Sequence, residues 1–186
     1  MRLNRGIVEL KRKVEDSEDR TRKDIEKTYI TSRGKWYGFS WKGDEAKSGG
    51  IATNIGVHFF DMLQWVFGAP LANVVNVSTP TRAAGYLELA RARVRWFLSL
   101  DAGDLPPQAI AAGRSTFRSI TIDGDEVEFS GGFEDLHTRS YKAILKGAGF
   151  GLEEARLSVE TVHKIRNTAP VGLVGEYHPL AGRSMK

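Results

Sequence analysis

The sequence predicts an α+β domain with an open, mostly antiparallel mixed sheet that is covered on one face by helices. Two observations predict this class. Runs with strand-like alternation follow one another between residues 72 and 132 without a helical pattern between them, and amphipathic helical patterns precede and follow that region. Consecutive strands without intervening helices favour antiparallel pairing. The same order of patterns argues against a doubly wound fold, in which strands and helices alternate.

The first part of the chain is expected to form a helix, a strand, a loop and a second helix. Apolar residues in 2–15 recur near a helical period, and IEKTYITSRG from Ile25 to Gly34 alternates as a half-buried strand does. Residues 35–50 form a loop rich in aromatic residues, glycines and lysines, and such loops often carry function. The next helix runs from Asn54 to Phe67 and ends at Gly-Ala-Pro.

The second part is expected to form strands followed by two helices. ANVVNVS at 72–78 and the segment 88–100 predict strands, and 115–132 predicts a hairpin that turns at Asp-Gly. Amphipathic helices are expected at 133–146 and 152–167. We expect 1–170 to form a single domain and 171–186 a C-terminal tail.

Composition excludes several classes of protein. The chain has 186 residues, no cysteine and a net charge of +4, so a disulfide framework and thiolate metal sites are excluded. The excess positive charge is mixed with acidic residues, and no nucleic-acid-binding motif is present, so we expect no nucleic-acid partner. No apolar run is long enough to span a membrane, and the charged N-terminus does not resemble a signal peptide. We therefore expect a cytoplasmic protein with no membrane contact.

The glycines of GAGFG, residues 147–151, do not form a dinucleotide-binding loop. That motif needs G-x-G-x-x-G between a strand and a helix, whereas these glycines follow a helix and their last spacing is wrong. We interpret Gly147 as the end of a helix in a helix-to-helix turn. No nucleotide-cofactor motif is found elsewhere in the sequence.

The segment GGIATNIGVHFFDMLQWVFG, residues 49–68, carries polar residues at helical spacing. Positions four apart share a helix face, so Asn54 and His58 project together, and Asp61 continues that face. Chemistry alone leaves two interpretations open. The residues form a binding or catalytic site, or Asn54 caps the helix, His58 is a satisfied side chain and Asp61 pairs with a cation. We expect no metal site, because no other ligand is obviously positioned to complete a set.

A second polar cluster lies at the start of the penultimate helix, in DLHTRSY. Thr138 and Tyr141, with His137 and Arg139, are candidates for an anion-binding helix end. Helix capping combined with surface charge is the alternative interpretation, and the residues alone do not decide between them.

Several motifs in order resemble one enzyme family. GGIATNIGVHFFD resembles the G-G-x-x-x-[DN]-x-G-x-H-x-x-D segment of the Gfo/Idh/MocA oxidoreductases. The resemblance extends to TYITSRGKWYGFSWKGDEAKSGG, TFRSITIDGDEVEFSGG and DLHTRSYKAILKGAGFGLEEARLSVETVHKIRN, and so covers almost the whole chain. These segments resemble the subgroup that acts on UDP-N-acetylglucosamine-type sugars in surface-polysaccharide biosynthesis.

The resemblance implies a specific architecture and cofactor. Family members have an N-terminal Rossmann domain that holds NAD, followed by an α/β domain that supplies substrate contacts and the oligomer interface. This chain looks like the second domain alone, because the cofactor fingerprint and the lysine of the family's E-K-P motif are absent. Asn54 departs from the Asp that many members carry, although Asn is acceptable in the nucleotide-sugar subgroup.

The resemblance also implies roles for individual residues in oxidation of a sugar 3-hydroxyl. His58 is expected to be the general base, since a neutral imidazole with a pKa near 6.5 suits that role. Asn54 would orient the sugar hydroxyls, while Arg33 and Lys42 would hold a carboxylate or diphosphate. Thr138 and Tyr141 are weaker candidates for substrate contacts. Asp61 is expected to support the helix.

Two hypotheses from different classes follow. In the first, the chain is the substrate-binding half of an NAD-dependent nucleotide-sugar oxidoreductase, inactive alone and associated with a Rossmann domain, which is possibly a separate chain. In the second, it is a non-catalytic module that binds sugar nucleotides or only self-associates. Both predict a homo-oligomer that forms through the open sheet, because an uncovered apolar sheet face needs a partner.

Overall fold

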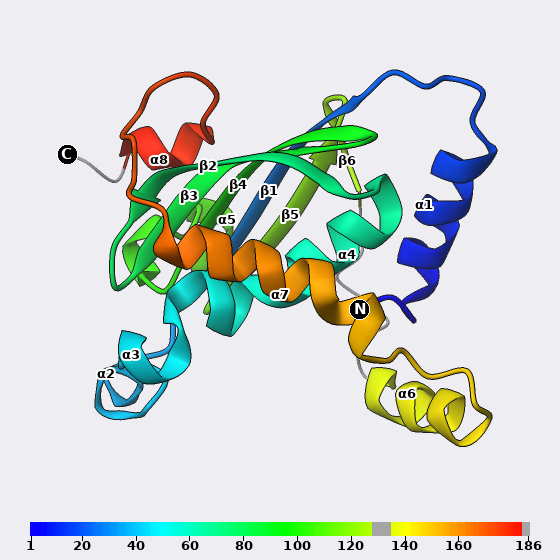
Figure 1. The fold of residues 1–186 in the computed structure, drawn as a ribbon. Helices are drawn as coiled ribbons and strands as arrows, with labels where there is room; N and C mark the ends of the chain where they lie inside the picture. The colour runs from blue at the N-terminus through cyan, green and yellow to red at the C-terminus, as the bar shows by residue number, and fades with distance from the viewer. Residues whose placement is uncertain (128–134, 184–186) are drawn as a thin grey trace.

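A computed structural model describes residues 1–127 and 135–183. Its centre is a six-stranded sheet of order β2-β3-β4-β1-β5-β6 (Figure 1). The strands are β1 (Lys23–Thr31), β2 (Pro70–Ser78), β3 (Arg82–Leu89), β4 (Ala92–Ser99), β5 (Thr116–Ile122) and β6 (Asp125–Glu126). Among these six described strands, β1 pairs with β4 in parallel and the other pairings are antiparallel. The predicted mixed, mostly antiparallel sheet is therefore confirmed.

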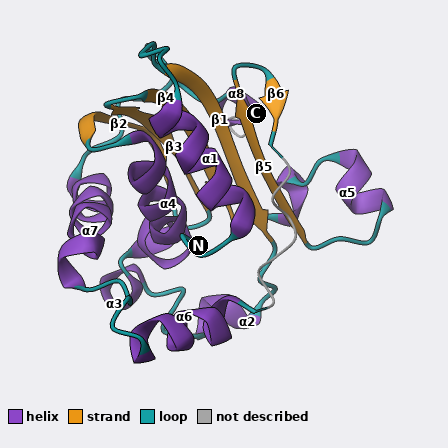
Figure 2. Cartoon of the chain, turned by 90° about the vertical axis from the view of Figure 1, so that its right-hand side faces the viewer, coloured by secondary structure: helices purple, strands orange, loops and turns teal. Residues whose placement is uncertain are grey.

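The longer helices pack on one face of this sheet. Figure 2 shows α1, α4 and α7 on the same side. The helices are α1 (Arg5–Asp16), α2 (Trp36–Phe39), α3 (Glu45–Ser48), α4 (Val57–Phe67), α5 (Pro107–Ala111), α6 (Leu136–Leu145), α7 (Leu152–Asn167) and α8 (Pro179–Arg183). A π-helical turn at Ala52–Gly56 precedes α4, and a 3₁₀ turn lies at Ala102–Asp104.

Alternation along the central strands builds the main core. Ile25 and Tyr29 of β1 and Trp96 of β4 point toward the helices, where Trp96 meets the edge of the Phe60 ring at 5.3 Å between centroids. Each fully buried aromatic or aliphatic side chain of this kind contributes about 1.5–3 kcal/mol to stability. The hydrophobic alternation in the sequence is thus what fixes which face α4 and α7 cover.

Among the described residues, a second, smaller cluster covers one end of the opposite face of the sheet. Ile30 and Phe97 form this cluster with Leu105, Ala109 and Ala181. The last of these belongs to the tail, whose Val171 amide donates to the Val75 carbonyl at 2.9 Å. The C-terminal segment is therefore folded onto the sheet through residue 183, and the division at residue 170 stays a prediction.

The predicted strand at 88–100 is wrong in its extent. Two strands occupy this region, β3 and β4, joined at Ala90-Arg91, and β3 starts as early as Arg82. The prediction failed because the two joining residues carry none of the Gly, Asn or Asp signals of tight hairpins.

Gly85 within β3 lies against the Trp96 ring, and a Cβ there would come within 2.6 Å of that ring.

The other predicted elements are largely confirmed. The hairpin at 115–132 turns at Asp123-Gly124 as expected, although its end lies outside the described residues, as does the start of the helix predicted at 133–146. Gly147 follows α6 with a φ of +70°, which confirms it at the end of that helix. The structure adds the short helices α2, α3 and α5 where loops were expected.

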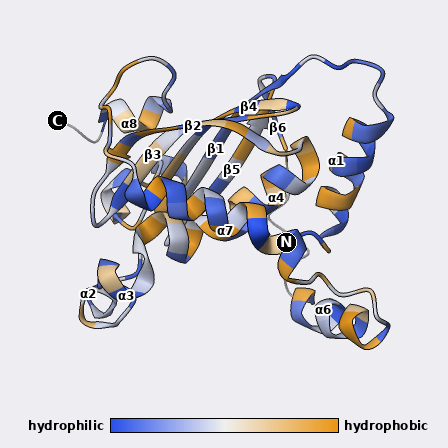
Figure 3. Cartoon of the chain, in the orientation of Figure 1, coloured by the Kyte–Doolittle hydropathy of each residue, from blue (hydrophilic) through white to orange (hydrophobic). Residues whose placement is uncertain are grey.

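Helix α6 differs from the other long helices in its burial. None of its residues is buried, and Figure 3 colours part of this helix as hydrophobic where it projects below the sheet. Within the described ranges, none of the helices has both the length and the apolar character needed to cross a membrane.

Candidate functional site

The glycine-rich segment before α4 sets the position of the candidate site. Gly49 and Gly50 both have a positive φ, of 77° and 78°, so the chain turns there in a conformation that other residues rarely adopt. The turn leads into the π-helical residues Ala52–Gly56, and α4 continues from Val57. The helix predicted from Asn54 to Phe67 therefore begins earlier and with a wider first turn. Such π-turns are rare and often lie at functional sites.

Gly56 allows this wide turn to pack directly on the sheet. A Cβ at this position would lie 2.8 Å from Leu98 Cδ1 of β4 and 2.9 Å from the Phe60 ring. Two core side chains therefore occupy the space that a larger residue would need. The segment carrying Asn54 and His58 is thereby held against the sheet.

A cavity of about 330 Å³ brings together four of the six substrate-site residues expected from the sequence. Arg33, Lys42, Asn54 and His58 all line it. They come from the end of β1, the aromatic loop, the π-turn and α4. Thr138 and Tyr141 do not line it, and both are exposed on α6, Tyr141 with 68% of its surface accessible. Asn54 and His58, which were paired from their helical spacing, thus share a cavity with two cations that lie 12 to 25 positions earlier in the sequence.

Asn54 is held by a residue that sequence reasoning did not single out. Its Nδ2 donates a hydrogen bond of 2.6 Å to the phenolic oxygen of Tyr37, which is buried. Tyr37 belongs to α2 within the aromatic loop, and this contact connects that loop to the π-turn. This bond uses one of the two Nδ2 hydrogens, so the other Nδ2 hydrogen and the Oδ1 acceptor of Asn54 remain for further hydrogen bonds.

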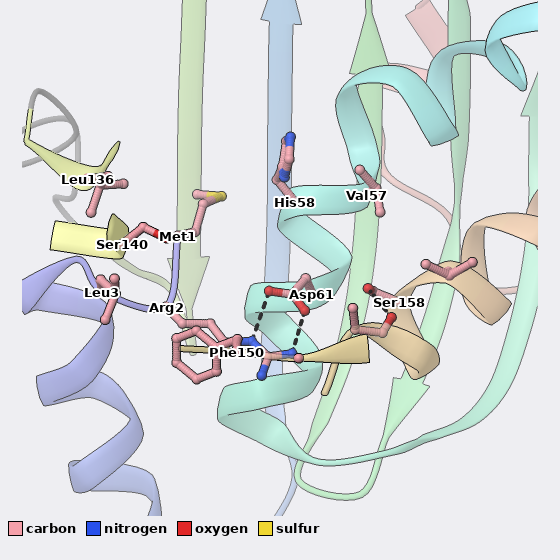
Figure 4. A pocket seen from close by; sticks show the side chains of 13 residues that line it. Met1, Arg2, Leu3, Val57, His58, Asp61, Leu136, Ser140, Phe150 and Ser158 are labelled. Carbon is pink, nitrogen blue, oxygen red and sulfur yellow. Dashed lines mark hydrogen bonds and ion pairs between the residues drawn. The ribbon is translucent and has the colours of Figure 1, made fainter. Parts of the chain in front are cut away.

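His58 lies between two cavities. It lines the 330 Å³ cavity and also a second one of about 350 Å³, whose other walls include Val57, Leu136 and Phe150 (Figure 4). Partial burial lowers the pKa of the His58 imidazole below its ordinary value; the positive amino terminus adds to this effect, and Asp61 opposes it. The imidazole is therefore neutral at pH 7 and able to accept a proton.

Asp61 forms an ion pair one turn beyond His58. Arg2 donates from Nη2 to Asp61 Oδ1 at 2.5 Å and from Nε to Oδ2 at 3.0 Å, as the dashed lines in Figure 4 mark. The same guanidinium donates to the Glu154 carbonyl and lies 4.9 Å from the centre of the Phe150 ring. Asp61 thus ties the start of the chain to α4 and to the start of α7, as expected for a supporting residue.

Arg118 of β5 is a cavity residue that the sequence analysis missed. Its guanidinium lies 5.0 Å from the centre of the Tyr29 ring, and Nη2 donates to the Tyr29 hydroxyl at 3.4 Å. Tyr29 and Arg118 are opposite each other in the β1–β5 pairing. The only sequence signal is the alternation of β5, which places Arg118 on the same face as the buried Ile120.

The cavity is positively charged. Arg33, Lys42 and Arg118 line it, and none of the described residues that line it is a carboxylate.

Lys27 lies close to the cavity and is fully buried. Its Nζ lies 4.0 Å from the centre of the Phe59 ring and donates a hydrogen bond to the Thr28 carbonyl. Burial lowers the pKa of Lys27 well below its ordinary value, and the charge of Arg118 lowers it further. A site with these donors suits an anionic ligand. Across the described ranges, no group of three or more His, Cys, Asp or Glu is placed to hold a metal ion.

Comparison with known proteins agrees with this geometry. The family model described as the oxidoreductase family, C-terminal alpha/beta domain, matches residues 24–108. A crystal structure of the WlbA (WbpB) dehydrogenase from Thermus thermophilus in complex with NAD and UDP-GlcNAcA is 49% identical over 96% of this chain, with a TM-score of 0.89. This chain belongs to the Gfo/Idh/MocA oxidoreductase family.

The family relatives are longer than this chain. The chain spans 57% of the Thermus thermophilus dehydrogenase, so it corresponds to the C-terminal part of such an oxidoreductase. The WlbA dehydrogenase from Bordetella pertussis, solved with NADH and UDP-GlcNAcA, is 17% identical over 92% of this chain, with a TM-score of 0.64. This chain covers 61% of that protein. At that identity the second comparison shows the shared fold alone.

Proposed function

We propose that this chain is the substrate-binding half of an NAD-dependent oxidoreductase that oxidises the 3-hydroxyl of a UDP-N-acetylglucosamine-type sugar or its uronate. The observation that carries the proposal is the single cavity lined by His58, Asn54, Arg33 and Lys42. It combines a proton acceptor, a hydroxyl-orienting amide and cations for an acidic ligand. The dehydrogenase complexes with NAD and UDP-GlcNAcA support the same assignment, and surface-polysaccharide biosynthesis is the proposed context.

In this proposal His58 acts as the general base. Its neutral imidazole accepts the proton of the sugar 3-hydroxyl as the hydride leaves C3, which gives a ketone and an imidazolium. Lowering of the His58 pKa by burial favours the neutral, proton-accepting form at pH 7. Proton acceptance within hydrogen-bond reach contributes roughly 10²–10⁴-fold to rate in enzymes of this kind.

The hydride acceptor would be NAD, which supplies a nicotinamide ring that takes up two electrons and one proton as hydride. The second cavity beside His58 would receive this ring against the apolar residues Val57, Leu136 and Phe150. The Arg2–Asp61 ion pair also lies in its wall. This chain has no G-x-G-x-x-G motif for the rest of a dinucleotide. The dinucleotide would therefore be held by a Rossmann domain outside these residues, on the same polypeptide or on a separate chain.

The remaining cavity residues bind and orient the sugar nucleotide. Asn54 binds sugar hydroxyls through Oδ1 and the second Nδ2 hydrogen, and its bond to Tyr37 fixes the orientation of the amide. Arg33 and Lys42 supply charge-assisted donors for a carboxylate or diphosphate. Thr138 and Tyr141 stay weaker candidates, because both lie on exposed positions of α6 outside the cavity.

We also propose that the chain forms a homo-oligomer through the open face of its sheet. That face carries Arg95, which pairs with Glu26 at 3.4 Å and with Glu176 at 3.2 Å, and it lacks the helical layer of the opposite face. Analytical ultracentrifugation tests this assembly, for which a dimer or larger species is expected. A strictly monomeric chain at micromolar concentrations would contradict it.

Calorimetry tests the proposed function most simply. The chain should bind UDP-GlcNAc or its uronate, and an Arg33→Gln change should weaken that binding, whereas Arg114→Gln, an exposed arginine that is not a cavity residue, should not. The chain alone should not reduce NAD, and addition of a Rossmann-domain partner should restore NADH formation. Failure to bind either sugar nucleotide would contradict the proposal.

A further inference from the structure

The three cations of the cavity differ in how firmly they are held. Lys42 lies on the aromatic loop beside the Trp41 ring, with its Nζ 5.9 Å from the ring centre, and Trp41 is itself 58% exposed. Arg118 instead lies within β5, in the centre of its pairing with β1. A guanidinium anchored on a strand has a better-defined position than an ammonium on an exposed loop.

A short chain of aromatic contacts fixes Arg118 relative to the base. The guanidinium lies over Tyr29, and the Tyr29 and Phe59 rings are 4.9 Å apart between centroids. Phe59 directly follows His58 on α4, and both Tyr29 and Phe59 are buried. The contact between Arg118 and Tyr29 is therefore built on the same rigid packing that positions His58.

Lys42 lies where two cavities meet. It lines the 330 Å³ cavity and also a smaller one of about 90 Å³, which is walled by Tyr37, Gly49 and Gly50. An elongated ligand that extends from the larger cavity past Lys42 would place a linking diphosphate beside this ammonium. Lysine suits such a phosphate as a point charge, whereas the planar arginine fork matches a carboxylate through two parallel hydrogen bonds.

We infer that Arg118 is a specificity-determining residue that recognises the carboxylate of a uronic acid sugar. Through it the cavity distinguishes a UDP-linked uronate from the corresponding neutral sugar. This inference rests on the proposed function, and it assigns a role that neither the sequence motifs nor the comparisons give to Arg118. Arg33 lines the same cavity.

Calorimetry with two ligands tests the inference on the full chain. UDP-GlcNAcA and UDP-GlcNAc are titrated separately into the unmodified protein, Arg118→Gln, Arg118→Lys and the control Arg114→Gln. The unmodified chain and the control should prefer the uronate by about tenfold or more, as expected for a charge-assisted contact. Arg118→Gln should lower the affinity for UDP-GlcNAcA far more than the affinity for UDP-GlcNAc, so that the two affinities come to within about twofold of each other. Arg118→Lys should retain a partial preference.

The outcomes separate this inference from the proposed function. Equal weakening of both ligands by Arg118→Gln, or an unmodified chain without preference, would overturn the role of Arg118 while leaving sugar-nucleotide binding intact. An unmodified chain that binds neither ligand would overturn the proposed function itself. Circular dichroism and thermal unfolding identify any variant that fails to fold. If Arg118→Gln does not fold, Arg118→Lys, which keeps the positive charge, tests the inference, and an undiminished preference for the uronate in this variant would contradict it.

Discussion

Asn54 and Tyr37 are joined by a hydrogen bond of 2.6 Å that links the π-turn before α4 to the aromatic loop. The phenol is 8% exposed, so the amide of Asn54 is fixed by a buried partner while the residue still lines the cavity. In the proposed site this contact fixes the orientation in which the Asn54 amide faces a sugar. An Asp at this position, as in many family members, could not donate to Tyr37 in the same way.

Replacement of Tyr37 by Phe should weaken sugar-nucleotide binding with little effect on folding. The change removes one hydrogen bond, worth about 1 kcal/mol, and lets the Asn54 amide rotate. Calorimetry should show a several-fold loss of affinity, and the exposed Tyr177→Phe should show none. Unchanged affinity in Tyr37→Phe would show that the hydrogen bond between Tyr37 and Asn54 does not contribute to ligand binding.

Replacement of His58 by Ala should act on turnover in an enzyme assembled with its cofactor domain. We expect kcat to fall by roughly 10²–10⁴-fold and KM to change little, because the proton acceptor is lost while binding contacts remain. His163→Ala on the exposed side of α7 is the matched control. In the unmodified enzyme, kcat/KM should decline on the acid side with an inflection below pH 6.5, because burial lowers the His58 pKa. Steady-state kinetics across pH checks both expectations, and equal turnover with and without the imidazole would exclude His58 as the base.

Replacement of Asp61 by Asn should destabilise the fold. Arg2 would keep its contacts with Phe150 and the Glu154 carbonyl but lose a partly buried carboxylate partner. We expect a loss of about 1–3 kcal/mol in the free energy of unfolding, measured by urea denaturation. Glu153→Gln removes an exposed i,i+3 pair with Arg156 and should leave stability nearly unchanged. A similar small effect for both variants would mean that the Arg2–Asp61 pair does not hold these segments together.

His178 should make the stability of the chain depend on pH. It is buried, its Nε2 lies 3.0 Å from Thr28 Oγ1, its Nδ1 accepts from the Leu180 amide, and its ring stacks on Phe97. An acceptor at Nδ1 leaves the proton on Nε2, so the native ring is neutral. Burial, followed by the charges of Lys27 and Arg95, lowers the pKa of His178 to about 4.

The sign of this effect follows from the two pKa values. Between pH 6.5 and 4 the unfolded chain binds a proton at His178 that the folded chain does not, so stability is complete above pH 6.5 and is lost as pH falls toward 4. The full loss is about 3 kcal/mol. Urea denaturation at pH 7.5, 6 and 5 measures it, and His178→Gln should flatten the dependence. An equally steep dependence in His178→Gln would assign it to other groups.

Local patterns predicted most elements but not how they meet. The helix at 152–167 and the strand at 72–78 follow from periodicity, and the turn at Asp123-Gly124 follows from its residues. The division of 82–99 into β3 and β4 was missed because the joining residues Ala90-Arg91 carry no Gly, Asn or Asp signal. The π-turn at Ala52–Gly56 depends on packing against Leu98 of β4, which is not visible in a local pattern.

The same limit applies to the candidate site. His58 and Asn54 could be paired from their spacing on one helix, because positions four apart lie on one face. Arg118 reaches the cavity only because β5 pairs with β1, which places it opposite Tyr29. Tyr37 reaches Asn54 through the fold of the aromatic loop. Contacts between segments this far apart are set by tertiary structure, and one sequence shows them only where a family motif already marks them.

Nuclear magnetic resonance of the histidine rings tests the central claim most directly, because His58 lines the cavity and His163 lies exposed on α7. During titration of the unmodified chain with UDP-GlcNAcA, the ring signals of His58 should shift and saturate while those of His163 stay in place. The Arg33→Gln variant should require more ligand for the same shift. Ring signals of His58 that do not move at saturating ligand, or that move no more than those of His163, would contradict the assignment of this cavity as the sugar-nucleotide site.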